Sequence, residues 1–86
     1  MPMKAFMALA KALIKNEIGV DDSTILPVWS NEYTEMGPKA LFKINGTNVY
    51  YEVGYSDFYD SFSFRIYELR KNGGYTRKDL IDISKK

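Results

Sequence analysis

The segment Lys39–Tyr55, KALFKINGTNVYYEVGY, decides the fold, because apolar and polar residues alternate on both sides of Asn45-Gly46. Alternation with a period of two is typical of a half-buried β-strand. Asn-Gly is a strong signal for a two-residue hairpin turn, since both residues tolerate positive φ. The segment therefore predicts an antiparallel β-hairpin.

A two-residue turn also fixes the register of this hairpin. The predicted cross-strand pairs are Ile44–Thr47, Phe42–Val49 and Ala40–Tyr51 on one face, and Leu41–Tyr50 and Lys39–Glu52 on the other. Apolar residues then face apolar residues, and a lysine faces a glutamate. This agreement between turn chemistry and pairing supports the register.

A third strand is predicted from Phe62 to about Arg70. Pairing Tyr55 with Phe62 sets Glu52 against Arg65, whereas a slip by one residue turns the charge toward the apolar face. The remaining pairs are Val53–Phe64, Tyr51–Ile66 and Tyr50–Tyr67. The three strands form an antiparallel meander with residues 49–55 in the centre and residues 56–61 as a loop.

An amphipathic helix is predicted before the sheet. Its apolar residues recur at helical spacing, which places them on one face: Met3, Phe6, Met7, Ala10, Leu13 and Ile14. Pro2 suits the first turn, and Gly19 follows the expected end near Asn16. We expect this helix to pack on one face of the sheet.

Residues 76–84 are compatible with two structures. The preferred one is a short C-terminal helix, because Thr76 and Asp79 form a variant of the capping box and aspartates are poor strand residues. The alternative is a fourth antiparallel strand, with the pairs Ile81–Phe64 and Ile83–Phe62. The predicted fold class is thus α+β: an N-terminal helix packed on a three-stranded antiparallel meander, then either this helix (α-β-β-β-α) or the fourth strand.

The segment between the predicted helix and the hairpin has a less regular pattern. Pro27 permits a short edge strand there and excludes a central one. Trp29 needs apolar neighbours, so we expect residues 17–38 to lie across part of the domain. One arrangement folds this segment over the second face of the sheet.

Composition excludes several classes of function. A chain of 86 residues forms a single compact domain, residues 1–86, and contains no cysteine and no histidine. Thiolate metal sites and histidine-dependent triads are therefore excluded. We expect Asp57 and Asp60 to be turn-forming residues; the less favoured alternative is a carboxylate site that they form with Glu52. We expect no enzymatic activity, no catalytic residue, no metal and no cofactor. Without a secretion signal or an apolar run of about 18 residues, we expect a cytoplasmic protein with no membrane partner.

Two groups of residues are candidates for protein contact. The second sheet face presents large apolar side chains where a solvated face is normally polar: Leu41, Tyr50, Tyr67 and Leu69. Phe58 and Tyr59 occupy the tip of the loop between the second and third strands. The preferred function is a protein-interaction domain that acts as an adaptor, as an inhibitor of a larger host protein, or as a homo-oligomer, in the manner of phage or mobile-element accessory proteins.

The alternative function is nucleic-acid binding through the basic segment 65–78. The net charge is only +1, so any such binding depends on local cations. The candidates are Arg65, Arg70, Lys71, Tyr75, Arg77 and Lys78. The α-β-β-β-α order is similar to that of double-stranded-RNA-binding domains and of small toxin ribonucleases. The lysine-rich motif of the first and the catalytic histidine of the second have no counterpart, so no family is assigned.

Overall fold

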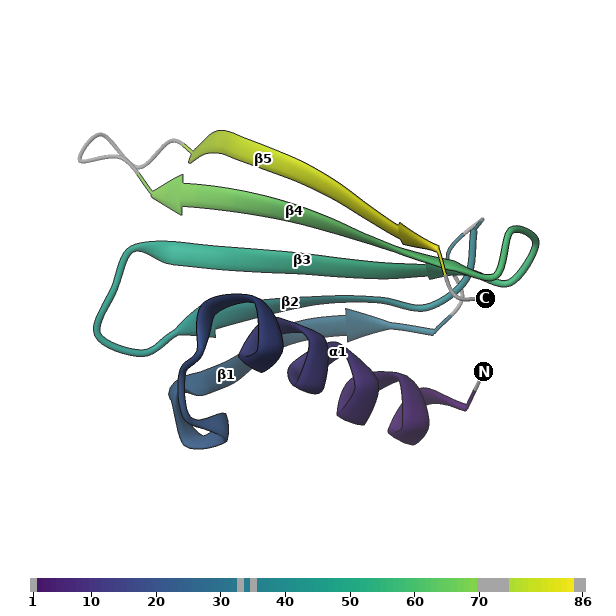
Figure 1. The fold of residues 1–86 in the computed structure, drawn as a ribbon, viewed down its shortest axis with the longest axis horizontal. Coiled ribbons are helices and arrows are strands. Elements are labelled where there is room, and N and C mark those ends of the chain that lie inside the picture. Colours follow the sequence, from purple (N-terminus) through teal and green to yellow (C-terminus); the bar gives the residue numbers. More distant parts are fainter. Residues whose placement is uncertain (1, 33, 35, 70–74, 85–86) are drawn as a thin grey trace.

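The computed structural model describes residues 2–32, 34, 36–69 and 75–84, the last range by its backbone. Its elements are α1 (Met3–Ile18), the 3-10 turn η1 (Asp22–Thr24), β1 (Ile25–Asn31), β2 (Lys39–Ile44), β3 (Val49–Ser56), β4 (Ser61–Leu69) and β5 (Tyr75–Ser84). The described strands form one five-stranded antiparallel sheet in the order β1-β2-β3-β4-β5. Helix α1 lies across one face of it (Figure 1), which confirms the predicted α+β class.

Helix α1 has the predicted apolar face. Phe6, Ala10 and Ile14 are fully buried, and the other members of the stripe pack against them. The helix ends where Gly19 takes the left-handed conformation, with φ 69°, and its N–H donates to the Lys15 carbonyl at 2.8 Å. Glycine adopts this φ without a Cβ clash, which is why it ends helices so often.

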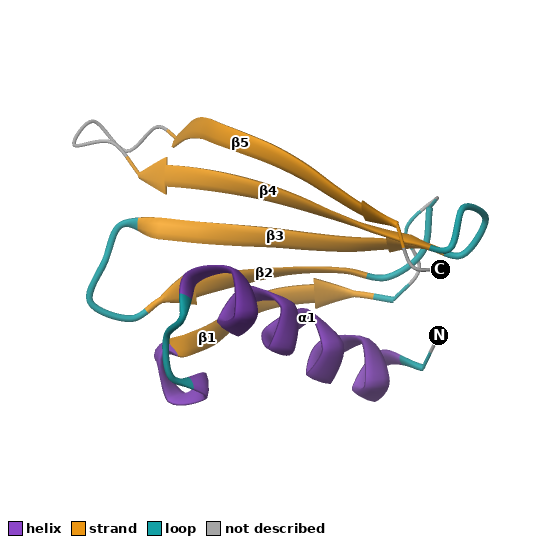
Figure 2. Ribbon diagram, in the orientation of Figure 1, coloured by secondary structure: helices purple, strands orange, loops and turns teal. Residues whose placement is uncertain are grey.

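The core lies between α1 and the face of the sheet that α1 covers, which we call the inner face. Phe42, Val53 and Phe64 come from three neighbouring strands and are fully buried. The rings of Phe6 and Phe62 stack at a centroid distance of 6.4 Å, which ties the helix to β4. Each such side chain contributes about 1.5–3 kcal/mol through burial, so this layer supplies most of the stability. Figure 2 shows the helical and strand layers side by side.

The register between β3 and β4 confirms the prediction in full. Tyr55 pairs with Phe62, Glu52 with Arg65 and Tyr50 with Tyr67, together with the predicted pairs Val53–Phe64 and Tyr51–Ile66. One slipped residue would exchange the inner and outer faces. The burial of one face therefore fixes the register.

The predicted C-terminal helix is wrong, and the alternative strand is correct. Residues 75–84 form β5, and the predicted pairs Ile81–Phe64 and Ile83–Phe62 are both present. A bulge shifts the register between Ile66 and Tyr67. The exposed edge of β4 offers unpaired backbone groups that a strand satisfies and a helix does not, so tertiary context outweighs local propensity. The element order shared with double-stranded-RNA-binding domains is lost with the helix.

The predicted register between β2 and β3 is wrong by two residues. Leu41 lies opposite Glu52, and Lys39 lies opposite Gly54, because the connection is a four-residue loop, residues 45–48. The Thr47 hydroxyl donates to the Ile44 carbonyl at 2.7 Å and accepts from the Val49 N–H at 3.1 Å. These bonds hold the longer loop. A shift by two residues leaves every side chain on its predicted face.

The segment before β2 widens the sheet. It forms the predicted edge strand, β1, and Trp29 pairs with Leu41 as its neighbour in the sheet. The expectation that this segment lies across the domain is therefore wrong, and Trp29 remains 47% exposed. Pairing with β2 satisfies backbone groups that would otherwise be left at the edge.

Gly37 should tolerate substitution less well than Gly46. Both have positive φ, 135° and 80°, but only at Gly37 would an added Cβ meet a neighbour, the Tyr55 carbonyl oxygen at 2.3 Å. We expect Gly46→Ala to cost about 1–2 kcal/mol of unfolding free energy and Gly37→Ala about 2–4 kcal/mol. Urea denaturation of the two variants measures the difference. Equal losses would show that the close approach at Gly37 relaxes without cost.

Candidate functional site

The candidate site is the face of the sheet opposite α1, which we call the outer face. Cross-strand pairing arranges its residues in rows. The rows are Leu26–Lys43–Tyr50–Tyr67, then Trp29–Leu41–Glu52–Arg65, then Asn31–Lys39–Gly54–Ser63. The first row is mainly apolar and the last is polar, so the character of the face changes along the strands.

The predicted contact residues share this face. Tyr50 lies directly opposite Tyr67, Leu41 lies one row away from them, and the Leu69 N–H donates to the Asn48 carbonyl at 2.9 Å beyond the first row. All four predicted residues are half-buried. Leu26 and Trp29 extend the same surface over β1, with 39% and 47% of their surface exposed. In the described part of the chain, no helix or strand packs over this surface.

Sequence reasoning missed Leu26 and Trp29 as members of this surface. In one of the two arrangements compatible with the sequence Trp29 covers the outer face, whereas in the structure it is a part of that face. The available signal was Pro27 within the short apolar run 25–29, which is compatible with an edge strand that adds to the sheet. The bulge between Pro27 and Trp29 could not be read from the pattern.

A charged group lies at the centre of the outer face. The Glu52 carboxylate is 3.3 Å from an Arg65 guanidinium nitrogen and 3.9 Å from the Lys39 ammonium. The Glu52 side chain is only 19% exposed, which explains why it has two partners. The Nε of Arg65 is buried and has no hydrogen-bond partner among the described residues. The guanidinium therefore retains donor capacity that the protein does not use.

The tip of the β3–β4 hairpin carries the most exposed rings. Phe58 is 86% exposed and Tyr59 is 68% exposed, and the two rings meet edge to face at 4.8 Å. The Tyr59 N–H donates to the Ser56 hydroxyl at 3.1 Å, and the Tyr55 hydroxyl donates to the Asp60 carboxylate. Internal hydrogen bonds thus hold the tip while both predicted contact residues face solvent.

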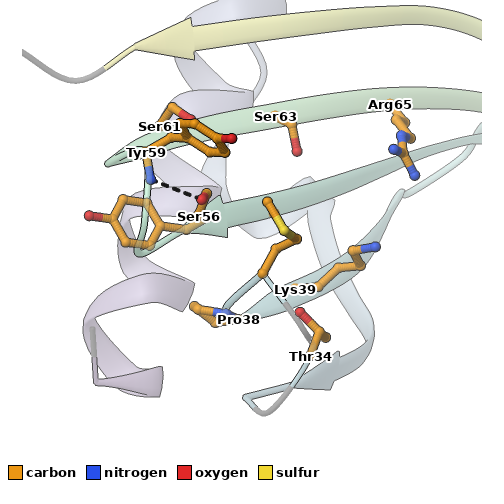
Figure 3. Close-up of a pocket in the computed structure, with 11 residues that line it drawn as sticks. Thr34, Pro38, Lys39, Ser56, Tyr59, Ser61, Ser63 and Arg65 are labelled. Atoms are coloured by element: carbon orange, nitrogen blue, oxygen red, sulfur yellow. Dashed lines mark hydrogen bonds between the residues drawn. The ribbon is translucent and has the colours of Figure 1, made fainter.

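A pocket of about 540 Å³ lies between the hairpin tip and the polar rows of the outer face. Figure 3 shows Lys39 and Arg65 at one end and Tyr59, Ser56 and Ser61 at the other. The full lining is Thr34, Met36, Pro38, Lys39, Gly54, Tyr55, Ser56, Tyr59, Ser61, Ser63 and Arg65. Pockets of about 300–1,000 Å³ are the usual size of ligand sites. No local sequence pattern predicts this pocket, because its lining residues come from segments that are far apart in the chain.

The basic segment 65–78 is only partly described. Arg65 lies on the outer face, and the strand β5 contains Tyr75, Arg77 and Lys78. Arg70 and Lys71 lie outside the described residues. The structure does not bring the predicted nucleic-acid residues together on a helix, since the helix that was to present Arg77 and Lys78 is a strand.

Among the described residues, no group of three or more acidic, cysteine or histidine side chains is arranged to hold a metal ion. In the same part of the chain, no helix is both long enough and apolar enough to cross a membrane.

Comparison of the chain with models of protein families, with curated proteins and with solved structures finds no match. The site is therefore interpreted from its own geometry.

Tyr55 should titrate far above an ordinary tyrosine. The hydrogen bond to Asp60, assisted by burial and by the charges of Asp60 and Asp57, raises the pKa of Tyr55 to about 12. The unfolded phenol loses its proton near pH 10. Between about pH 10 and 12 the folded state thus binds more protons, and stability falls as pH rises.

The Asp60→Asn variant tests this assignment. Asparagine tolerates the positive φ of 49° at this position, but it removes the carboxylate. We expect the pKa of Tyr55 to move toward 10, as measured by phenolate absorbance against a Tyr55→Phe reference. An unchanged titration would show that Asp60 does not hold the tip through this hydroxyl.

Proposed function

We propose that this chain is a non-enzymatic protein-interaction domain whose outer face binds another protein. The observation that carries the proposal is the position of Trp29 beside Leu41 in the sheet, which leaves the outer face without a second layer among the described residues. Large apolar side chains on such a face are unusual for a solvated sheet. A surface of this kind is typical of interaction sites.

The composition of the face suits a protein partner. Tryptophan, tyrosine and arginine are the residues that most often dominate binding energy at interfaces, and here they occur as Trp29, Tyr50, Tyr67 and Arg65. Aromatic and aliphatic residues predominate in the first row, and the charged group of Glu52, Arg65 and Lys39 occupies the next two rows. A partner with an apolar patch beside an acidic one would complement both parts of the face.

An adaptor, an inhibitor of a larger host protein and a homo-oligomer would all use this same face. The proposal includes the exposed hairpin tip as a second contact, because Phe58 and Tyr59 continue the surface past the pocket. Asp57 and Asp60 flank these rings, so the tip favours a neutral or basic partner surface and disfavours nucleic acid. The lack of cysteine is compatible with a reducing compartment such as the cytoplasm.

Single-stranded nucleic acid is the second candidate. Trp29, Tyr50 and Tyr67 could provide rings on which bases stack. Two of the described outer-face cations, Lys39 and Arg65, already share Glu52, which leaves little charge for phosphates. If this alternative holds, affinity for oligonucleotides should fall steeply with the logarithm of salt concentration, whereas apolar contact should not.

Replacing Leu26 and Trp29 with serine should abolish partner capture or self-association while the fold is kept. Both side chains are exposed on the edge strand, so their loss costs little stability. The expected loss of affinity is at least about tenfold, since a single interface tryptophan is often worth 2 kcal/mol or more. Affinity capture with quantitative mass spectrometry measures heterologous partners, and light scattering measures self-association.

Leu9→Ser is the matched control for these variants. Leu9 is also 39% exposed, as Leu26 is, but it lies on α1. Captured proteins should be retained by Leu9→Ser and lost with Leu26→Ser/Trp29→Ser. If the two behave alike, and circular dichroism shows both folded, the outer face does not bind the partner.

A further inference from the structure

From the pocket at the polar end of the outer face, we infer that it binds the carboxylate of an acidic side chain in a partner peptide. This inference rests on the proposed interaction function and specifies the chemistry of the partner. It is drawn from the shape of the pocket, its charge and its unused hydrogen-bond donors.

The shape is that of a site for one or two side chains. Gly54 forms part of the lining, where an added Cβ would lie 3.2 Å from the Ser63 hydroxyl and 3.8 Å from the Lys39 side chain. The absence of a side chain there leaves room between strands that otherwise carry large residues. On the loop side, Thr34 donates to the Gly37 carbonyl and the Asp57 N–H donates to the Met36 carbonyl at 3.1 Å. The first bond holds the β1–β2 loop, and the second joins this loop to the hairpin tip.

The charge of the pocket favours one negative group. Lys39 and Arg65 line it, and Glu52 lies within 4 Å of both. The two lining cations and their shared carboxylate leave a charge of one positive unit at this end of the pocket, and the tip carboxylates Asp57 and Asp60 are not among the residues that line it. A carboxylate neutralises that charge, whereas a phosphate dianion would leave an excess negative charge beside Glu52.

The hydrogen-bond donors suit the same group. Arg65 gives one nitrogen to Glu52, and its buried Nε has no partner in the described part of the chain. A buried N–H without an acceptor is costly, and Arg–carboxylate pairs gain from two parallel hydrogen bonds. The hydroxyls of Ser61 and Ser63 add donors along the lining. An entering carboxylate therefore meets several donors, of which the Arg65 Nε is already withdrawn from water.

The neighbours of the anion site favour a peptide over a free small anion. Tyr59 and Met36 also line the pocket, with 68% and 55% of their surface exposed. An apolar residue next to the acidic one can cover them. Acidic residues beside apolar ones are thus the expected motif of the partner.

The test uses the whole chain and a displayed library of random heptapeptides held between Gly-Ser linkers, which presents no free C-terminus. Selected peptides should carry Asp or Glu at one fixed position with an apolar neighbour. Binding of a fluorescein-labelled selected peptide, measured by anisotropy, should weaken by about tenfold in Lys39→Gln and in Arg65→Gln. An analogue of the peptide with Asn or Gln in place of the acidic residue should bind the unsubstituted protein weakly. Its affinity should not exceed that of the acidic peptide for Lys39→Gln or Arg65→Gln.

Two further variants separate binding from folding. Glu52→Gln removes the carboxylate that competes for Arg65, so it should tighten the acidic peptide by about three- to tenfold. Lys4→Gln is the control, because Lys4 is an exposed lysine on α1 that belongs neither to the outer face nor to the lining of the pocket. It should leave the affinity unchanged. A merely structural role of Lys39 or Glu52 would not produce this opposite pair of effects.

Three outcomes would overturn the inference. One is a selection whose peptides share no acidic position, or acidic peptides whose affinity is unchanged in Lys39→Gln and Arg65→Gln. Another is displacement of the peptide by millimolar inorganic phosphate, which would identify a phosphate site. The third is stronger binding of oligothymidylate with equal losses in Lys39→Gln and Lys43→Gln, which would indicate nucleic acid. If the pocket fails but partner capture still depends on Leu26 and Trp29, the proposed function stands; if both fail, it falls as well.

Discussion

The packing of α1 on the inner face is the contact on which the rest of the structure depends. One helix of sixteen residues covers one side of the sheet. Its residues Phe6, Ala10 and Ile14 are fully buried in this contact. The described part of the chain has no second long helix for the other side. The outer face therefore has to combine strand-forming residues with enough polarity to remain in water, and this requirement shapes everything found there.

The inner face was predictable because its burial leaves few alternatives. Apolar and polar residues alternate in β3 and β4, and only one register keeps the charge of Glu52 out of the core. The observed pairs follow that register. The helix was predictable for the same reason, since Phe6 and Ile14 belong to one stripe and Gly19 ends it. Even the error of two residues at the Asn45-Gly46 turn left the faces intact. Long apolar patterns constrain structure more than individual turns do.

The site was less predictable, because it depends on contacts between segments far apart in the chain. Asn45-Gly46 by itself predicts a complete two-residue turn, but the Thr47 hydroxyl stabilises a longer loop. The strand β5 was disfavoured by its aspartates, although the edge of β4 outweighs their propensity. Tyr50, Tyr67 and Leu69 were placed correctly on the outer face. The pocket beside them arises where the loop around Gly37 meets the hairpin tip, and no local pattern encodes such a meeting.

The edge of the sheet bears on how a partner can approach. A free edge strand invites another strand to pair with it, and β1 is such an edge in the described sheet. Pro27 has no N–H to donate, and the register of β1 shifts between Pro27 and Trp29, so a continuous ladder cannot form along it. These features oppose strand addition at β1 while leaving the side chains of Leu26 and Trp29 exposed on the outer face. Contact across the face, directed by side chains, is thus favoured over pairing along the edge, and such contact can be selective because Glu52, Lys39 and Arg65 lie within it.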